Sequence, residues 1–87
     1  MTLYIDPPMW PGHGRMWSHL VSDVSYDELH EFAARIGSPP RAFDGDHYDV
    51  PSTLYDTAVR AGAVPVDSKE LLHRLVAAGL RRRKNAP

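Results

Sequence analysis

The sequence predicts a small α/β domain with a short, mostly parallel sheet of about three strands and three helices, packed in two or three layers. Short β-branched and aromatic runs alternate along the chain with amphipathic helical patterns. Two of these helical patterns begin with capping-box spacing, and a glycine follows all three. Strands that alternate with helices usually join through right-handed crossovers, which makes the strands parallel.

Length and composition limit what this chain can be. Its 87 residues suit one domain, which we assign to residues 1–80, with a basic tail at residues 81–87. Eleven acidic residues nearly balance ten basic ones, so no global charge favours nucleic acid or an anionic membrane. The absence of cysteine excludes disulfides, thiolate zinc ligands and cysteine nucleophiles. Such a short chain buries a thin core, and a homodimer would add burial.

No segment of the sequence is typical of membrane insertion or export. No stretch approaches the roughly 20 apolar residues that a membrane span needs. The first five residues contain no basic region and reach Asp6 at once, so they do not form a signal peptide. The expected location is therefore the cytoplasm, with no membrane partner.

The first third of the chain is expected to form a strand, a long loop and a helix. Residues 2–5 are a β-rich run that Pro7 and Pro8 end, because proline cannot continue a ladder. Residues 7–24 hold three prolines, two glycines, two tryptophans and two histidines, which predicts an ordered irregular loop with at most one helical turn at 17–21. Ser25 begins a capping box with Glu28 and a helix follows.

The rest of the chain is expected to add two strands and two helices. Gly37 ends the first helix, and a short extended segment follows at residues 41–43. Residues 44–50 read as a second polar loop, and Pro51 stands near the start of the second helix. The third strand covers residues 63–66, where Pro65 predicts an edge position. The last helix begins with an Asp67–Glu70 capping box, and its predicted apolar stripe contains Leu71, Leu72, Leu75 and Val76.

Three strings carry a family resemblance. They are WPxHGRxWSHL at residues 10–20, ELHxFA at residues 28–33 and DHYD at residues 46–49. Together they resemble a family of small bacterial and phage proteins known as a domain of unknown function. The resemblance extends over nearly the whole chain. It implies a stand-alone unit, and it implies no activity.

The first polar loop contains candidate ligands and acid–base groups. Asp6 ends the first strand, where parallel sheets border a ligand crevice, and aspartate there often binds metal. His13 and His19 are candidate metal ligands or general bases, and Arg15 between them suits a phosphate. Their spacing matches no recognised ligand signature. The structural alternative is that the carboxylate and the imidazoles only hydrogen-bond the loop.

The second polar loop is the densest ionisable segment of the sequence. Asp44, Asp46 and Asp49 surround His47, and such close carboxylates repel unless a cation, an arginine or a proton offsets them. A divalent ion would do so, either Mg²⁺ or Mn²⁺, or Zn²⁺ if the histidines dominate. The segment is not an EF-hand, because Asp49 stands where the turn glycine belongs and Tyr55 where the bidentate glutamate belongs. The structural alternative is a solvated turn.

Two function classes follow from these segments. The first is a metal-dependent hydrolase or phosphoesterase-like site. In it the metal ligands are Asp6, His13, Asp46 and Asp49, and the catalytic groups are His19, His47 and Arg15, of which Arg15 neutralises developing charge. The second is a non-catalytic binding module for protein or nucleic acid, built from Trp10, Trp17 and the basic run at 81–84. The structural alternative for the two tryptophans is core packing, and for the basic run it is a favourable interaction with the dipole of the preceding helix.

The two polar loops are expected to meet. Each would follow a strand of a parallel sheet, and the carboxyl ends of parallel strands lie at one edge. We therefore predict that His19 and His47 lie in one pocket with Asp6 or Asp49, and that their protonation is perturbed there.

Overall fold

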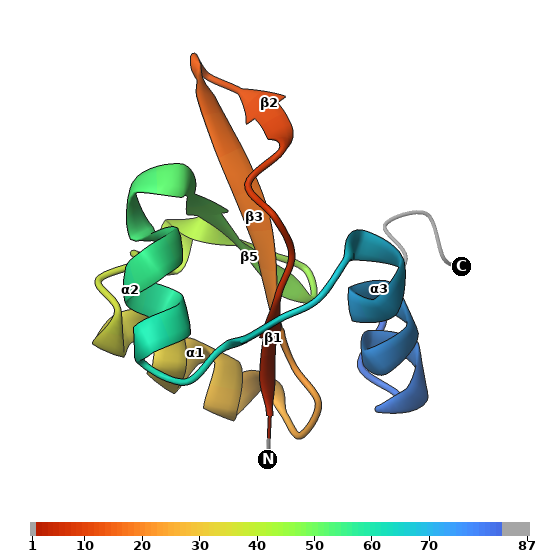
Figure 1. Cartoon of the computed structure of the whole chain (residues 1–87). Coiled ribbons are helices and arrows are strands. Elements are labelled where there is room, and N and C mark those ends of the chain that lie inside the picture. The colour runs from red at the N-terminus through yellow and green to blue at the C-terminus, as the bar shows by residue number, and fades with distance from the viewer. Residues whose placement is uncertain (1, 83–87) are drawn as a thin grey trace.

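The computed structural model describes residues 2–82 as three layers, with helices on both faces of a mixed β-sheet (Figure 1). Helices α1 (Tyr26–Arg35) and α2 (Tyr55–Arg60) cover one face, and α3 (Ser68–Ala77) covers the other. The predicted α/β class and three α-helices are confirmed. Two short 3₁₀ helices, η1 (Pro40–Ala42) and η2 (Ser52–Leu54), connect the elements of the middle region. The extended segment predicted at 41–43 is therefore wrong for residues 41 and 42, and the second helix begins four residues after Pro51, which ends a strand instead.

The sheet differs from the prediction in both strand number and direction. Within residues 2–82 it has six strands, with β4, β5, β3, β1 and β6 in spatial order and β2 paired to β3 beside β1. Only β1 and β6 pair in parallel; the other four pairings are antiparallel. The strands are β1 (Leu3–Ile5), β2 (Trp10–Gly12), β3 (Arg15–Ser22), β4 (Phe43–Asp44), β5 (His47–Pro51) and β6 (Val64–Pro65).

Both segments predicted as polar loops are β-hairpins. In the first, Gly12 pairs with Arg15, so His13 and Gly14 form a two-residue turn with φ values of 50° and 73°. Positive φ at both positions is the pattern of a type I′ turn, whose twist suits a hairpin. In the second, Asp44 pairs with His47 around Gly45 at φ 76°. Two-residue turns join antiparallel strands, and this is why the predicted parallel order and helical turn at 17–21 are wrong.

Strand alternation divides the core into two parts. Leu20 of β3 and Tyr48 and Val50 of β5 face α1 and α2 in the larger cluster. Val21 of β3 packs with Tyr4, Leu71 and Leu75 under α3. Since neighbouring residues in a strand point to opposite faces, the odd-numbered positions of β3 and β5 all lie on the α3 side.

Helix starts and ends agree with the capping predictions. Ser25 and Asp67 are the N-caps, and their side chains accept hydrogen bonds from the backbone N–H of Glu28 and Glu70. The Glu28 carboxylate does not complete a reciprocal capping box; it accepts a hydrogen bond from Ser22 Oγ instead. The edge position of the strand containing Pro65 is also confirmed.

The predicted apolar stripe of α3 is only partly buried. Leu71 and Leu75 are in the core, whereas Leu72 and Val76 are 44% and 54% exposed. Within the described part of the chain, no helix has the length and apolar character to cross a membrane.

Candidate functional site

Three side chains that could bind a cation meet on the α3-side face of the sheet. His19 lies directly opposite Asp49 in the antiparallel register of β3 and β5. His47 stands two residues before Asp49 on β5, so the two side chains point to the same face. The site therefore results from strand register and alternation, and not from strand ends meeting at one edge.

The three side chains are close enough to share one ion. One ligand atom from each of His19, His47 and Asp49 lies within 4.8 Å of the other two. Within residues 2–82, these three residues are the group of potential metal ligands that lie this close together. His47 Nε2 is 3.2 Å from Asp49 Oδ1, and the two imidazole centroids are 5.2 Å apart. All three side chains are partly exposed, at 31%, 17% and 42%. We call His19, His47 and Asp49 the triad.

A buried carboxylate holds the first imidazole of the triad. Asp6 is fully buried, and its Oδ2 lies 2.8 Å from His19 Nδ1. Its Oδ1 accepts the backbone N–H of His19 at 2.6 Å. Both β1 and β2 pair with β3, and Pro7 and Pro8 lie in the gap between them, so the carboxylate takes the place of a strand carbonyl for this N–H. Trp10 Nε1 and Ser68 Oγ also donate to Asp6.

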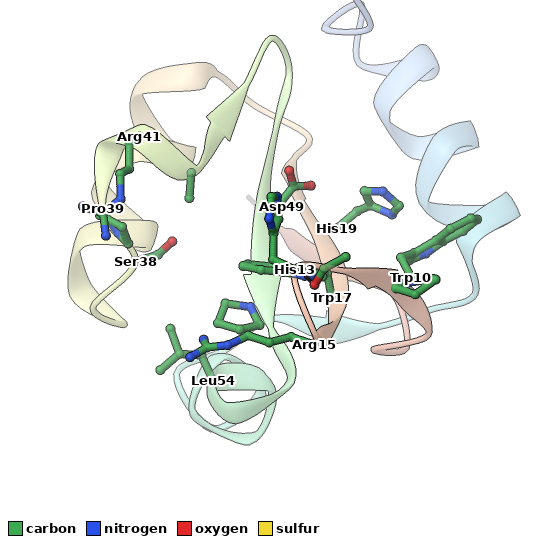
Figure 2. A pocket seen from close by; sticks show the side chains of 14 residues that line it. Trp10, His13, Arg15, Trp17, His19, Ser38, Pro39, Arg41, Asp49 and Leu54 are labelled. Atoms are coloured by element: carbon green, nitrogen blue, oxygen red, sulfur yellow. Dashed lines mark hydrogen bonds between the residues drawn. The ribbon is translucent and has the colours of Figure 1, made fainter.

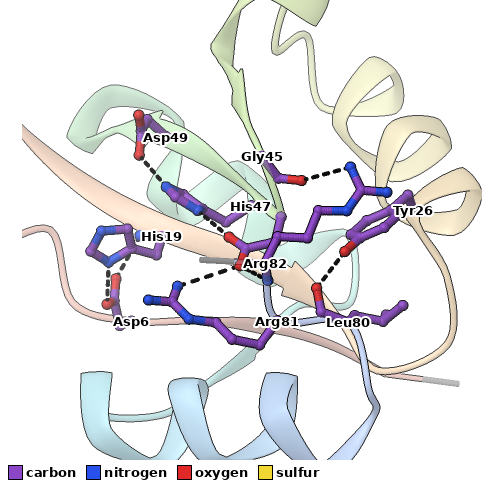
Figure 3. A network of polar contacts seen from close by, with 10 residues as sticks. Asp6, His19, Tyr26, Gly45, His47, Asp49, Leu80, Arg81 and Arg82 are labelled. Atoms are coloured by element: carbon purple, nitrogen blue, oxygen red, sulfur yellow. Dashed lines mark hydrogen bonds and ion pairs between the residues drawn. The ribbon is translucent and has the colours of Figure 1, made fainter. Parts of the chain in front are cut away.

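A second buried carboxylate holds the other imidazole in the same way. Asp46 is 2% exposed, and its Oδ1 lies 2.8 Å from His47 Nδ1. Its Oδ2 accepts the backbone N–H of Arg82 at 2.8 Å and an N–H of the Arg81 guanidinium at 3.3 Å (Figure 3). A carboxylate accepts hydrogen bonds, so the Nδ1 of each imidazole donates to its aspartate. Each Nε2 then lies at the other side of its ring, where that of His47 is 3.2 Å from Asp49 Oδ1.

The surroundings shift the protonation of two of these groups. Burial acts to raise the pKa of Asp6, but hydrogen bonds from His19 and Ser68 and the charge of His19 outweigh it, so the pKa lies below 3.8. Burial acts to lower the pKa of His47, but the hydrogen bonds and negative charges of Asp49 and Asp46 raise it above 6.5 overall. Without a cation, the two aspartates thus favour a protonated His47.

An open cavity of about 580 Å³ begins at His19 and Asp49 and extends along the β2–β3 hairpin, while His47 is not among its lining residues (Figure 2). Its volume is in the range of small-molecule sites in proteins. His19 and Asp49 form one part of the wall. The remaining wall combines aromatic, cationic and small side chains: Trp10, Pro11, Gly12, His13, Arg15, Trp17, Ser38, Pro39, Arg41, Ala42, Pro51 and Leu54.

The residues predicted as metal ligands or catalytic groups occupy three kinds of position. His19, His47 and Asp49 come together in the triad. Asp6 and Asp46 are buried behind the imidazoles and outside the group that could share an ion. The two polar loops do meet, as predicted, although through antiparallel pairing.

His13 and Arg15 line the cavity away from the triad. His13 is the exposed first residue of the hairpin turn, and Arg15 is exposed at the start of β3. Arg15 is four positions before His19 on β3, which corresponds to about 13 Å between their Cα atoms. Arg15 therefore lies at the outer part of the cavity and is not a member of the triad.

Several contacts of the site were not anticipated from the sequence. Arg81 and Arg82 belong to the predicted tail, yet they bind Asp46, and the Arg82 guanidinium lies 4.1 Å from the Tyr26 ring centroid. Tyr26 also donates to the carbonyl of Leu80. The rest of the predicted tail, residues 83–87, lies outside the described residues. The sequence near Arg81 and Arg82 does not indicate which distant residue they contact, so no local pattern could predict these hydrogen bonds.

Comparison with known proteins identifies a family and no function. A family model described as "Protein of unknown function (DUF4031)" matches residues 3–78, which include the triad and both supporting carboxylates. Neither the curated proteins nor the solved structures give a significant match to the chain.

Proposed function

The chain belongs to the DUF4031 family, and from this premise we propose that it is a metal-dependent hydrolase whose triad holds a divalent cation. One observation carries the proposal. His19, His47 and Asp49 converge within 4.8 Å, and each imidazole has its Nδ1 on a buried carboxylate. Histidine ligands of metals usually donate their second ring N–H to a carboxylate or carbonyl, which fixes the tautomer and the ring orientation.

The ligand set favours Zn²⁺ or Mn²⁺ over Mg²⁺. Two imidazole nitrogens and one carboxylate suit transition metals, whereas Mg²⁺ prefers oxygen ligands and retains several waters. Two atoms bound at 2.0–2.1 Å to a tetrahedral ion lie about 3.3 Å apart. The distance of 3.2 Å between His47 Nε2 and Asp49 Oδ1 agrees with this value. A small rotation of the His19 or Asp49 side chain would complete the coordination.

Three protein ligands suit catalysis better than a purely structural ion. Structural zinc sites use four protein ligands, while catalytic sites keep one position for water or substrate. Here that position would face the cavity that His19 and Asp49 border. A cation held by His19, His47 and Asp49 would supply an activated water near neutral pH and would polarise the oxygen of a phosphoryl or acyl group.

The supporting carboxylates would strengthen the triad as ligands. Negative charge at Nδ1 raises the basicity of Nε2, and the loss of such a partner typically costs 10–100-fold in metal affinity. Asp46 is tied to Arg81 and Arg82, and Asp6 to Ser68 at the start of α3. Both imidazoles are therefore held by segments from the C-terminal part of the domain.

Metal content and metal titration test the proposal. Protein purified without a histidine tag and without added metal should contain one transition-metal ion per chain, or bind one Zn²⁺ in calorimetry after chelation. His47→Ala and Asp49→Asn should each remove this binding. His73→Ala is the matched control, because His73 is exposed on α3 outside the triad.

Hydrolysis is the second readout. A chromogenic phosphodiester should be cleaved by the Zn²⁺- or Mn²⁺-loaded wild type and by the His73 variant, and not by the His47 variant. If the wild type binds no divalent metal, the hydrolase proposal is wrong. Salt-dependent binding of oligonucleotides by a metal-free protein would then favour a non-catalytic binding module.

A further inference from the structure

The cavity wall beyond the triad is aromatic and cationic. Trp10 and Trp17 provide two indole rings, and Arg15 and Arg41 provide two guanidinium groups. Among the described lining residues, Asp49 supplies the only carboxylate, and it belongs to the triad. A ligand that matches this wall has an aromatic part and an anionic part.

Strand alternation sets these groups in order along the cavity. Arg15, Trp17 and His19 are alternate residues of β3, so their side chains share one face at intervals of about 7 Å. Trp17 thus lies between a cation and the triad. Trp10 pairs with Trp17 across β2 and β3, and its ring centroid is 5.1 Å from that of His19.

Hydrogen bonds fix both indole rings before any ligand arrives. Trp17 Nε1 donates to the carbonyl of Gly12 at 2.7 Å, and Trp10 Nε1 donates to Asp6 at 3.3 Å. Trp10 nevertheless remains 43% exposed. Rings that are held at one edge and open to solvent form stacking platforms at a low entropic cost.

The opposite wall carries a polar group that lacks a partner. Ser38 lines the cavity and is 4% exposed, and its Oγ makes no hydrogen bond within the described part of the chain. Arg41 lies on the same side of the cavity as Ser38 and Pro39 (Figure 2). A buried hydroxyl without a hydrogen-bond partner is costly, but the Ser38 Oγ is too enclosed to reach a ligand unless this wall moves, so Arg41 is the group of this wall that can contact an anion.

We propose that the cavity binds nucleotides, with a base stacked on Trp10 or Trp17 and phosphate held by Arg15 or Arg41. The inference rests on the proposed hydrolase for its reaction, a metal-dependent hydrolysis of a phosphate ester, in which water adds to phosphorus and the ester oxygen leaves. Its binding step does not depend on the metal. Because the cavity is open, a single-stranded oligonucleotide can continue beyond one nucleotide.

Tryptophan fluorescence reports this binding directly. The chain contains two tryptophans, and both line the cavity. In EDTA, AMP and a short oligo(dA) should each quench the emission and saturate, with the oligonucleotide tighter than AMP. Ribose 5-phosphate, which lacks the base, should bind at least tenfold more weakly than AMP. Equal affinity for AMP and ribose 5-phosphate, or no saturable binding of either nucleotide, would overturn the proposal.

Variants assign the two parts of the ligand to the two parts of the wall. Arg15→Gln should lower the slope of log affinity against log salt for oligo(dA) by about one, since one phosphate contact is lost. Arg60→Gln is the matched control, because Arg60 is exposed on α2 outside the cavity, and its slope should equal the wild type. Identical slopes for all three proteins would rule out Arg15 as a phosphate contact.

The tryptophans are tested separately. Trp10→Phe and Trp17→Phe each leave one tryptophan in the chain. The variant whose emission is still quenched by AMP retains the indole ring on which the base stacks. Trp10→Ala and Trp17→Ala should weaken AMP binding about tenfold at the ring that stacks. Circular dichroism checks that each variant folds, and the phenylalanine variants replace any alanine variant that does not. If neither substitution changes affinity, no base stacks on the hairpin.

The metal arm separates this inference from the proposed function. Nucleotide binding in EDTA with no metal uptake would sustain the inference and refute the hydrolase. Metal uptake and cleavage of a simple phosphodiester, without AMP or oligo(dA) binding, would sustain the hydrolase and refute the inference. Tighter binding of AMP than of oligo(dA) would limit the ligand to mononucleotides, and it would refute the proposal that a single-stranded oligonucleotide continues beyond the cavity.

Discussion

Replacing Asp6 by alanine should destabilise the fold more than any other single carboxylate removed from the site. Asp6 is fully buried and accepts hydrogen bonds from His19, Trp10 and Ser68. The Trp10 and Ser68 donors are partly exposed and can turn to water. The backbone N–H of His19 cannot turn to water, because it is fixed in β3 and points into the gap between β1 and β2, where Asp6 is its acceptor.

The magnitude follows from the two bonds to His19. A hydrogen bond to a charged group contributes roughly 1.5–3 kcal/mol. The His19 side chain is 31% exposed, so solvent screening reduces its share. The expected loss is about 3–5 kcal/mol, out of about 4–13 kcal/mol for a domain of this length. This corresponds to a fall in Tm on the order of 15–30 °C.

Urea denaturation of the wild type and the Asp6→Ala variant measures this loss at pH 7, with Asp56→Asn, an exposed residue of α2, as control. The pKa of Asp6 is lowered in the fold, so its contribution is complete above the unfolded value of 3.8 and is lost as pH falls through the folded value. The gap between wild type and variant should therefore shrink below pH 3.8. A loss under about 1 kcal/mol, or a gap that stays constant to pH 2, would refute this reasoning.

Three further predictions concern other groups of the site. In metal-free protein the raised pKa of His47 stabilises the fold, fully below pH 6.5, and this stabilisation is lost as pH rises through the folded pKa. The urea midpoint of the wild type should therefore fall more steeply with rising pH than the midpoint of His47→Gln. Parallel curves for the two proteins would contradict this prediction. Arg82→Ala should cost about 0.5–1 kcal/mol in urea unfolding, since it removes the guanidinium contacts with the Tyr26 ring and the Gly45 carbonyl but keeps the backbone N–H on Asp46; an unchanged midpoint would contradict this. Ser38→Ala should leave the thermal midpoint equal or higher, because it removes an unpartnered buried hydroxyl, and a marked fall would show that the hydroxyl has a partner in solution.

Local signals predicted the helices well. Capping at Ser25 and Asp67 involves residues at most three positions apart, so the sequence contains the whole interaction. The glycines at 37, 62 and 79 have positive φ, as expected for helix ends. The hairpins were missed although His13-Gly14 and Asp44-Gly45 are turn signals, because one strand of each hairpin has only two or three residues and resembles part of a loop.

The sequence by itself determined the α/β class, the boundaries of α1 and α3, the edge position of Pro65 and the identity of the polar groups that could do chemistry. Tertiary structure alone decided which of those groups share a site. The antiparallel register brings His19 opposite Asp49, and the gap between β1 and β2 buries Asp6 behind the imidazole. The segment after α3 returns to Asp46 across 35 residues of sequence. Such contacts depend on how strands pair and how chain ends pack, which the free energy of the whole core selects and no short stretch of sequence specifies.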